Sequence, residues 1–553
     1  MKSYILAYDI GTTGVKTCLF EVEDTIRLIR SAARDYPLYI LENGGAEQDV
    51  EDWWEGMAAC TREIFADGGA GNGQNGGNFS ADDGTIVTPD MIAGISFCSQ
   101  MQGLVLVDKD GKALRRAMSY MDQRAGDEIR KGIANGIQIA GANVKKLIPS
   151  LRITGAVAGS VKDPVWKYKW VEANEPEIFS NVYKWLDVKD YIILRCTGNF
   201  CMTADSAFGT LLYDTRPDSR GWSKELCNML EVNMDHLPDI IKSTDMAGKL
   251  TAKAALDLGL AEGTPVYGGG GDSSLIGVGA GAVRIGDTHI YSGTSGWVIT
   301  VTDRQTVDVT NMIAAIIGAE HGKYNYFAEM ETSGKCLEWV RDHLARDEIG
   351  IYSHEEEMKP GYYKEHSAEL YSRIMDAISD VPPGSGGVLF APWLHGNRCP
   401  FEDPTARGMF IGLGLDTGKA EMIHAVLEGV CYHLRWMLDC QDRKVKTSRT
   451  IRFVGGGALA QVSCQMLADI TGRVIETVDH PQNAGSVGAC AVAAVGLGLI
   501  GDLSEVGKFI PASAVYKPDQ DKHEAYKPYF KTFKKIYIAN KVLFHTLAKA
   551  RRK

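Results

Sequence analysis

The chain opens with short apolar runs separated by a polar turn that carries glycine. Residues 4–8 are apolar and aromatic, residues 9–14 are largely polar with two glycines, and branched and aromatic side chains recur over residues 15–20. This pattern predicts two strands joined as a hairpin with a polar tip. Strand-like stretches follow at residues 92–97 and 105–108, and strands then alternate with helical patterns, so the sequence predicts an α/β fold.

Glycine clusters follow two later strand-like stretches. Residues 265–267 run into glycines 268–271, and residues 451–454 run into glycines 455–457. Both clusters place backbone without side chains at the end of a strand. Between residues 421 and 438 apolar positions recur every three to four residues, which predicts an amphipathic helix packed against the sheet of a second domain.

Length and composition favour a folded enzyme with more than one domain. The chain has 553 residues and exceeds the size at which a single hydrophobic core stops growing, so we expect two large domains with a cleft between them. Hydrophobic residues make up 45% and charged residues 23%, which is typical of an ordered globular protein. Residues 66–89 are rich in glycine and asparagine, and we expect a flexible surface loop there, with a functional lid as the alternative.

Net charge and cysteine spacing restrict the classes of binding partner and the cellular compartment that we expect. The net charge of -11 argues against a nucleic-acid partner, and we interpret the basic run at residues 549–553 as a solvated chain end. The twelve cysteines include no CxxC pair, which argues against a disulfide framework or a zinc ribbon and suggests the cytoplasm. The first apolar stretch is too short for a signal peptide, and residues 487–500 have the length of a buried helix rather than a membrane span. The sequence leaves a homodimer open.

A carboxylate, two glycines, two hydroxyls and a cation follow the first strand in close order. They are Asp9, Gly11, Thr12, Thr13, Gly14 and Lys16. Glycine lets backbone amides approach phosphate oxygens, the hydroxyls and the cation add donors and charge, and Asp9 can hold Mg²⁺ directly or through water. A hairpin turn with solvated side chains is the alternative. The P-loop spacing GxxxxGK[ST] and a GxGxxG leading into a helix are both absent, which disfavours P-loop and Rossmann enzymes.

Asp272 follows the first glycine cluster at a predicted strand end. Phosphoryl transfer needs one group that orients the accepting hydroxyl and takes its proton, and a single carboxylate is enough. Asp272 is therefore the candidate general base, with capping of the following helix as the alternative. Residues 292–296 repeat the pattern of glycine and hydroxyl, as a second phosphate loop would, although this segment alone is also compatible with an ordinary turn.

Taken together, these segments resemble the FGGY carbohydrate kinases, a branch of the actin, Hsp70 and hexokinase group. The resemblance spans most of the chain as an ordered series of short motifs: DIGTTGVK at 9–16, QMQG at 100–103, MDQR at 121–124, KDY at 189–191, GGD at 270–272, GT at 293–294, PWLHGNR at 392–398 and GGGA at 455–458. Each motif is weak alone, and their order makes them specific. The resemblance implies two ribonuclease-H-like domains flanking a deep cleft, which we expect at residues 1–281 and 282–553.

The resemblance also implies a site for ATP, Mg²⁺ and a small sugar or polyol in that cleft. The residues implied for ATP and its phosphates are Gly11, Thr12, Thr13, Lys16, Gly293, Thr294, Gly456, Gly457 and Ala458. The residues implied for the accepting substrate are Gln102, Asp122, Asp272 and Ser273. The residues implied for Mg²⁺ are Asp9 and Asp272, and Asp272 faces the reactive hydroxyl as the base.

Within the family the chain most resembles the xylulokinases, which implies a ketopentose such as D-xylulose as the substrate. Two positions depart from that branch: Gln102 stands where histidine is usual, and Ser273 stands where asparagine is usual after the base. Both side chains would contact substrate hydroxyls, where a changed donor or acceptor can alter the accepted substrate by orders of magnitude. Kinases of the ribulose, erythritol or glycerol type are the alternatives.

Two alternatives come from other functional classes. An actin-like or Hsp70-like ATPase would share the loops and the fold, but Gln102, Asp122 and Asp272 indicate a polar substrate pocket, and the sequence offers no added peptide-binding domain. A catalytically idle sugar-binding regulator needs no base, whereas Asp272 and the loop residues are all present.

Overall fold

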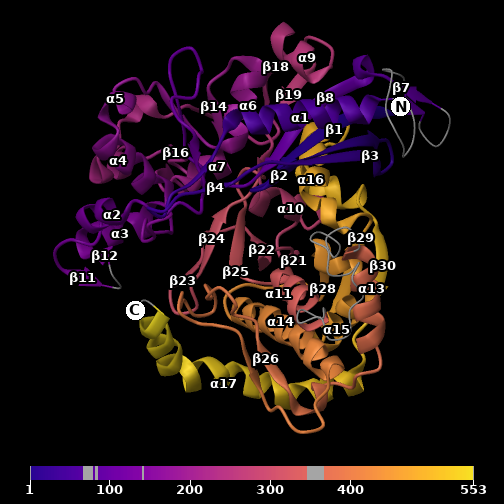
Figure 1. Cartoon of the computed structure of the whole chain (residues 1–553). Coiled ribbons are helices and arrows are strands. Elements are labelled where there is room, and N and C mark those ends of the chain that lie inside the picture. Colours follow the sequence, from indigo (N-terminus) through magenta and orange to yellow (C-terminus); the bar gives the residue numbers. More distant parts are fainter. Residues whose placement is uncertain (1, 67–78, 81–84, 140–141, 346–366, 552–553) are drawn as a thin grey trace, which may run out of the picture.

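The computed structural model describes residues 2–66, 79–80, 85–139, 142–345 and 367–551 (Figure 1). Most of the segment for which we predicted a flexible loop lies outside these ranges. Its described part contains two short antiparallel strands, β6 (Phe79–Ser80) and β7 (Ile86–Val87).

A mixed sheet forms the centre of the first half of the chain. In spatial order its strands are β18 (Met246–Lys249), β19 (Pro265–Tyr267), β8 (Ile92–Ser99), β1 (Ser3–Ile10), β2 (Gly14–Val22) and β3 (Ile26–Asp35), with β20 (Gly270–Gly271) beside β8. Strands β1 and β2 form the predicted hairpin, whereas β8 runs parallel to β1. Ile10 and Gly271 both pair with Ser99, so the hairpin tip and the start of the segment after β20 lie at one edge of the sheet.

The second half of the chain repeats this arrangement. Its strands in spatial order are β23 (Val307–Asp308), β24 (Ile313–Ile317), β25 (Tyr324–Met330), β22 (Gly296–Thr302), β21 (Thr288–Ser292), β28 (Thr450–Val454), β29 (Val474–Val478) and β30 (Ala512–Tyr516). Here β21 and β22 form the hairpin, and β28 runs parallel to β21. Tyr291 pairs with Val454, so the turn after β21 and the glycines after β28 share one edge.

Two helices rich in small residues join the halves. The helices α10 (Asp272–Gly279) and α16 (Ala484–Gly496) pack against each other, and α16 also packs against β1 and β8. A Cβ atom at Gly488 would lie 2.1 Å from the Leu275 carbonyl oxygen, so glycine permits this close approach. The predicted buried helix within residues 487–500 is confirmed. The boundary predicted after residue 281 falls between α10 and β21 and stays a prediction.

The remaining helices cover the two sheets. The amphipathic helix α14 (Lys419–Asp442) packs against β22 and β25, as predicted. The C-terminal helix α17 (Gln520–Arg551), yellow in Figure 1, runs along the outer side of the second half. Near the candidate site lie α4 (Pro164–Asn174), α6 (Val188–Thr197) and α7 (Ala204–Gly209), and farther from it lie α1 (Val50–Phe65) and α9 (Ala252–Leu258).

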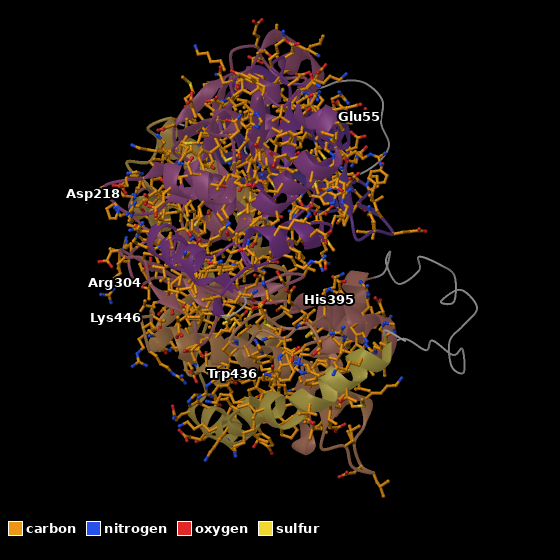
Figure 2. All side chains as sticks on the ribbon, turned by 90° about the vertical axis from the view of Figure 1, so that its left-hand side faces the viewer. Glu55, Asp218, Arg304, His395, Trp436 and Lys446 are labelled. Atoms are coloured by element: carbon orange, nitrogen blue, oxygen red, sulfur yellow. The ribbon has the colours of Figure 1, made fainter. Side chains whose placement is uncertain are left out.

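Charged side chains project from the outer surface of both halves. Figure 2 labels Glu55 and Asp218 on the first half and Arg304 and Lys446 on the second, and all four are exposed. Among the helices in the described ranges, none combines the length and the apolar character needed to cross a membrane. All twelve cysteines are buried and unpaired.

Candidate active site

The tip of the first hairpin is held from behind by polar side chains. The Gly11 carbonyl accepts a hydrogen bond from the Tyr36 hydroxyl at 2.6 Å, and the Thr12 carbonyl accepts one from Gln48 Nε2 at 2.7 Å. In a trans peptide the N–H group points opposite to the carbonyl. The amides of Thr12 and Thr13 therefore face away from these supports, which is the orientation a phosphate-binding loop requires.

Asp9 and Lys16 are cross-strand partners in this hairpin. The Lys16 ammonium donates to Asn483 Oδ1 at 2.8 Å, just before α16, so it links the first sheet to the second half. A Cβ atom at Gly485 would lie 3.0 Å from Asp9 Oδ2, which places this carboxylate against the first turn of α16. Burial raises the pKa of Asp9, and the Lys16 ammonium opposes this effect without cancelling it.

Asp272 is the first residue of α10, directly after β20. The N-cap position is Gly271, so Asp272 is not the capping residue, although its Oδ1 accepts the Ser273 amide at 2.7 Å. Burial raises the pKa of Asp272 to about 7, the Ser273 amide opposes this rise, and the negative charges of Asp9 and Glu329 add to it. A carboxylate with such a pKa is suited to take up a proton near neutral pH.

The predicted second phosphate loop is the tight turn between β21 and β22. The Gly293 amide donates to the Ser295 carbonyl at 3.0 Å, and the Gly293 carbonyl accepts from the Gly334 amide at 2.6 Å. The Thr294 carbonyl accepts from the Ser333 amide at 3.1 Å. Carbonyls on this loop are again held by neighbouring protein groups, as in the first hairpin.

The glycines after β28 pack directly on this second loop. A Cβ atom at Gly457 would lie 2.6 Å from Ser292 Oγ, and Ser292 Oγ is itself 2.7 Å from Ser333 Oγ. Gly457 and Ala458 are buried, whereas a Cβ atom at Gly456 would meet nothing within 4 Å. The residues predicted for phosphate and for adenosine in the second half therefore form one continuous surface.

Tyr291 connects this surface to the two carboxylates. A Cβ atom at Gly293 would lie 2.1 Å from the Tyr291 hydroxyl. Burial raises the pKa of this phenol, and the negative charges of Asp272 and Asp9 raise it further. Tyr291 therefore packs on Gly293 of the second loop and carries a phenol that responds to both carboxylates, and sequence reasoning missed it.

The loop that carries Gln102 is fixed by two buried charges. Gln102 has a φ angle of 61°, and its amide and that of Gly103 donate to the two oxygens of Asp187 at 3.0 and 2.8 Å. The Gln102 carbonyl accepts from Lys167 Nζ at 2.7 Å. Next to this loop, Ser273 Oγ lies 3.1 Å from the Met101 sulfur. The structure therefore places the loop that carries Gln102 against the start of α10, which carries Asp272 and Ser273.

Asp122 has a different environment from that expected of a substrate ligand. Its side chain is fully buried, and Oδ2 accepts from Arg124 Nη2 at 2.7 Å and from the Ala46 amide at 2.9 Å. Arg124 also pairs with Glu47 at 2.7 Å and stacks over Trp170. The partners of this carboxylate are protein groups, and its contact with a substrate stays a prediction.

The site residues that the motifs did not reveal are supporting ones. Tyr36, Gln48, Lys167, Asp187 and Tyr291 hold the loops from behind or lie between them. Lys167 stands in the aromatic stretch WKYKW and Asp187 in WLDV. A charge within a strongly apolar stretch was the available signal, because a buried charge needs a specific partner.

The carboxylates can be tested for their fit to Mg²⁺. Within the described ranges no three His, Cys, Asp or Glu side chains cluster closely enough to enclose a metal ion. Mg²⁺ at nucleotide sites usually takes one or two carboxylates and completes its shell with water and phosphate oxygens. Asp9 and Asp272 are buried carboxylates with raised pKa values and mutual repulsion, so this pair fits a cation that arrives with a nucleotide.

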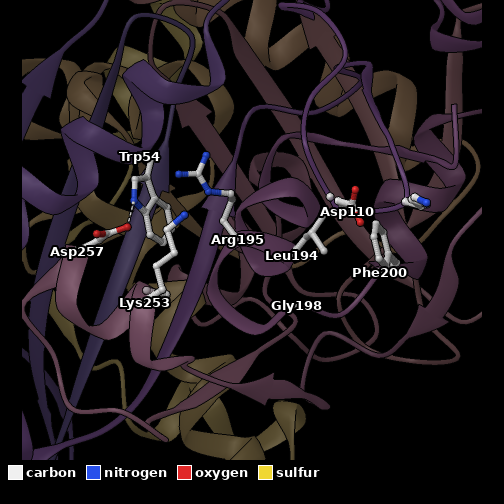
Figure 3. Close-up of a pocket in the computed structure, with 11 residues that line it drawn as sticks. Trp54, Asp110, Leu194, Arg195, Gly198, Phe200, Lys253 and Asp257 are labelled. Atoms are coloured by element: carbon white, nitrogen blue, oxygen red, sulfur yellow. Dashed lines mark hydrogen bonds between the residues drawn. The ribbon is translucent and has the colours of Figure 1, made fainter. Parts of the chain in front are cut away.

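A separate cavity of about 250 Å³ lies on the outer face of the first half, between α1, α6 and α9 (Figure 3). At one end of it Trp54 Nε1 donates to Asp257 Oδ2 at 3.2 Å, and the Arg195 guanidinium lies over the same indole ring. None of the predicted site residues lines this cavity. It is distinct from the candidate active site.

Comparison with known proteins agrees with this arrangement. Models for the N-terminal and C-terminal domains of the FGGY family of carbohydrate kinases match residues 4–279 and 289–497. Xylulose kinase from Bacillus subtilis (strain 168) is 28% identical over 556 residues, which cover 100% of this chain and 99% of the relative. Gluconate kinase and ligand-bound xylulose kinase, both from Lactobacillus acidophilus, each superpose with a TM-score of 0.79 at 25% identity, over 99% of this chain and 100% of theirs.

The predicted resemblance and fold are confirmed by these matches and by the two repeated sheets with their joined phosphate-type loops. The chain therefore belongs to the FGGY family of carbohydrate kinases, with the two-domain ribonuclease-H-like fold of that family, and is an enzyme that uses ATP to phosphorylate a sugar.

Proposed function

We propose that this kinase phosphorylates a hydroxyl of a ketopentose such as D-xylulose, with Asp272 as the general base. The observation that supports the base assignment is the buried position of Asp272 at the start of α10, where Ser273 Oγ lies 3.1 Å from the Met101 sulfur of the Gln102 loop, together with a pKa of about 7 for Asp272. The substrate proposal is supported by relatives named xylulose kinase that match the full length of the chain. Buried, unpaired cysteines support the cytoplasm as the compartment.

In the proposed reaction the protein positions both substrates and moves one proton. The amides of Thr12 and Thr13 and the Gly293–Thr294 turn bind the ATP phosphates, and the Gly456 segment binds adenosine. Asp272 takes the proton of the accepting hydroxyl as its oxygen bonds to the γ-phosphorus. The bond from the γ-phosphorus to the β–γ bridging oxygen breaks, and ADP leaves with that oxygen. Asp9 and Asp272 would hold Mg²⁺, which would supply positive charge to the phosphates.

Water is the competing acceptor, and we expect closure of the two domains to exclude it. The predicted domains, residues 1–281 and 282–553, carry the acceptor loop and the adenosine surface respectively. Closing these domains over both substrates would remove water from the base and complete the set of contacts on the phosphates.

A coupled assay of ADP release across acceptors tests the substrate proposal. The panel contains D-xylulose, D-ribulose, ketohexoses, glycerol, tetritols and gluconate, the last because a gluconate kinase is among the similar structures. We expect the highest kcat/KM with D-xylulose. A higher kcat/KM with any other member would replace the ketopentose assignment, and ADP release that no acceptor stimulates would contradict the base assignment as well.

A further inference from the structure

A row of charged side chains lies buried behind Asp272. Lys189 and Asp190, in the first turn of α6, are fully buried, and Asp205, in the first turn of α7, is 1% exposed. Lys189 Nζ is 2.5 Å from Asp190 Oδ1. Removing such charges from water is costly, and replacing them with apolar side chains of similar size is often neutral or stabilising in other proteins. Stability alone therefore does not account for this row.

Asp205 contacts the backbone immediately before the proposed base. Its Oδ2 accepts the Gly271 amide at 2.7 Å, while its Oδ1 accepts the Thr203 hydroxyl at 2.5 Å. Gly270 allows the approach, because a Cβ atom there would lie 3.0 Å from Asp205 Oδ2. A hydrogen bond from an amide to a carboxylate is stronger and more directional than one between neutral groups. The contact therefore fixes the peptide from which Asp272 projects.

Lys189 supplies the counter-charge for Asp205. Burial alone lowers the pKa of Lys189, but the carboxylates of Asp190 and Asp205 outweigh burial and raise it. The ammonium group therefore stays protonated. A protonated Lys189 offsets part of the cost of burying the carboxylates beside it.

The same end of α6 also fixes the acceptor loop. Asp187 is the N-cap of α6, and its carboxylate holds the amides of Gln102 and Gly103. Lys189 and Asp190 follow within one turn. The loop proposed to bind the acceptor is thus fixed to the same turn of α6 that carries Lys189 and Asp190.

We propose that Asp205 is a positioning residue that sets the location of Asp272 relative to the accepting hydroxyl, through the Gly271 amide. This inference rests on the proposed role of Asp272. It extends that role from the base itself to the buried groups that hold it. A displacement of about 1 Å at a reacting group can cost about 100-fold in rate, so a contact one residue from the base can control turnover.

Asp205→Ala and Asp205→Asn test the proposal, with D-xylulose and ATP as substrates or the best acceptor from the panel above. Asp205→Ala removes the acceptor of the Gly271 amide, and we expect kcat to fall about 10- to 100-fold while KM for ATP changes less than about twofold. Asp205→Asn keeps an oxygen for that amide, and we expect it to recover most of kcat.

The matched control is Asp214→Asn. Asp214 lies in β15 (Tyr213–Asp214), is buried, and accepts a hydrogen bond from the Arg216 amide at 3.0 Å. The control variant should leave kcat unchanged. ADP affinity by calorimetry shows whether each variant is folded, and Asp205→Asn preserves the test if the alanine variant does not fold. A wild-type kcat in folded Asp205→Ala, or a loss of about 10-fold or more in Asp205→Asn, would overturn the proposal.

Asp272→Asn measured in parallel separates this inference from the proposed function. Loss of turnover in Asp272→Asn together with normal turnover in both Asp205 variants would refute the positioning role alone. Normal turnover in Asp272→Asn would refute the base, and the positioning role with it.

Discussion

The acceptor side and the nucleotide side of the candidate site are held together by different kinds of contact. On the acceptor side, buried charges at Lys167, Asp187 and Asp205, each at most 3% exposed, hold backbone groups of the substrate loop and of the base. On the nucleotide side, hydroxyl groups and close glycine contacts join Ser292 to Ser333 and Gly457. Charged contacts in a dry interior tolerate little displacement, whereas a loop of neutral amides and hydroxyls suits a ligand that brings its own charge.

This contrast predicts that a substitution on one side of the site changes the kinetic constants for the substrate bound on that side and not for the other. Substitutions among the buried charges should change kcat or the KM of the acceptor. Substitutions in the glycine and hydroxyl contacts should change the KM of ATP. The experiments below can break the contrast or sharpen it.

Asp272→Asn should have the largest effect. The variant keeps the shape of the side chain and removes its ability to take a proton, so we expect kcat to fall by about 100-fold or more while ATP affinity by calorimetry is retained. Asp308→Asn is the control, because Asp308 is also buried and also accepts backbone amides, those of Thr310 and Asn311. Turnover near the wild-type value in Asp272→Asn would remove the base assignment.

The pH dependence follows from the pKa of about 7 for Asp272. The base works in its ionised form, so kcat/KM for the acceptor should fall toward tenfold per pH unit below about 7 and level off above it. Because the folded pKa is raised above the unfolded value of about 3.9, protonated Asp272 favours the folded state, and this stabilisation is lost as pH rises from about 4 to about 7.

Activity and the contribution of Asp272 to stability should therefore move in opposite directions over this range. Rate profiles at saturating ATP and thermal unfolding of the wild type and Asp272→Asn measure both. As pH rises from about 4 to about 7, the Tm of the wild type should fall relative to that of Asp272→Asn. A flat rate profile between pH 5.5 and 8 would show that Asp272 does not titrate there.

Lys167→Met tests the charged contacts of the acceptor side. Lys167 is fully buried and donates to the carbonyls of Gln102 and Ser119 at 2.7 and 2.8 Å, and methionine would leave both without this donor. We expect KM for the acceptor to rise about tenfold, KM for ATP to change less than about twofold, and Tm to fall. Lys169→Met, on the same helix but paired with Glu172 near the surface, is the control. Equal changes in both KM values would break the contrast between the two sides.

Two alanine variants test the nucleotide side. A Cβ atom at Gly457 would press on Ser292 Oγ at 2.6 Å, whereas one at Gly456 would meet open space. Gly457→Ala should lower Tm and raise KM for ATP about fivefold through the displaced loop. Gly456→Ala should leave Tm unchanged and raise KM for ATP only if adenosine occupies that space. An unchanged KM in Gly456→Ala would move the adenosine site elsewhere.

How far the sequence could predict the site depended on the distance between interacting residues along the chain. The first hairpin and the buried helix α16 were predicted because apolar spacing and turn residues act locally. The contact of Lys167 with Gln102 spans 65 residues and that of Asp205 with Gly271 spans 66. Apolar spacing and turn residues act locally and do not predict contacts over such distances along the chain. The ion pair of Asp122 with Arg124 is local, and the MDQR motif alone did not distinguish it from a substrate contact.

Lys16→Met should have the smallest effect. It distinguishes two roles for the Lys16 ammonium, which are phosphate binding and the link between the two halves of the chain. The sequence predicts that Lys16 binds phosphate, and in the structure its ammonium donates to Asn483 Oδ1 and to the Gln482 carbonyl at 3.2 Å. We expect KM for ATP to rise about threefold, because the backbone amides of the hairpin tip keep most of the phosphate contacts, and KM for the acceptor to stay unchanged. Asn483→Ala removes the partner and keeps the ammonium, so it should lower Tm without raising KM for ATP. If both variants lower Tm equally and neither changes KM, Lys16 links the halves and does not bind phosphate.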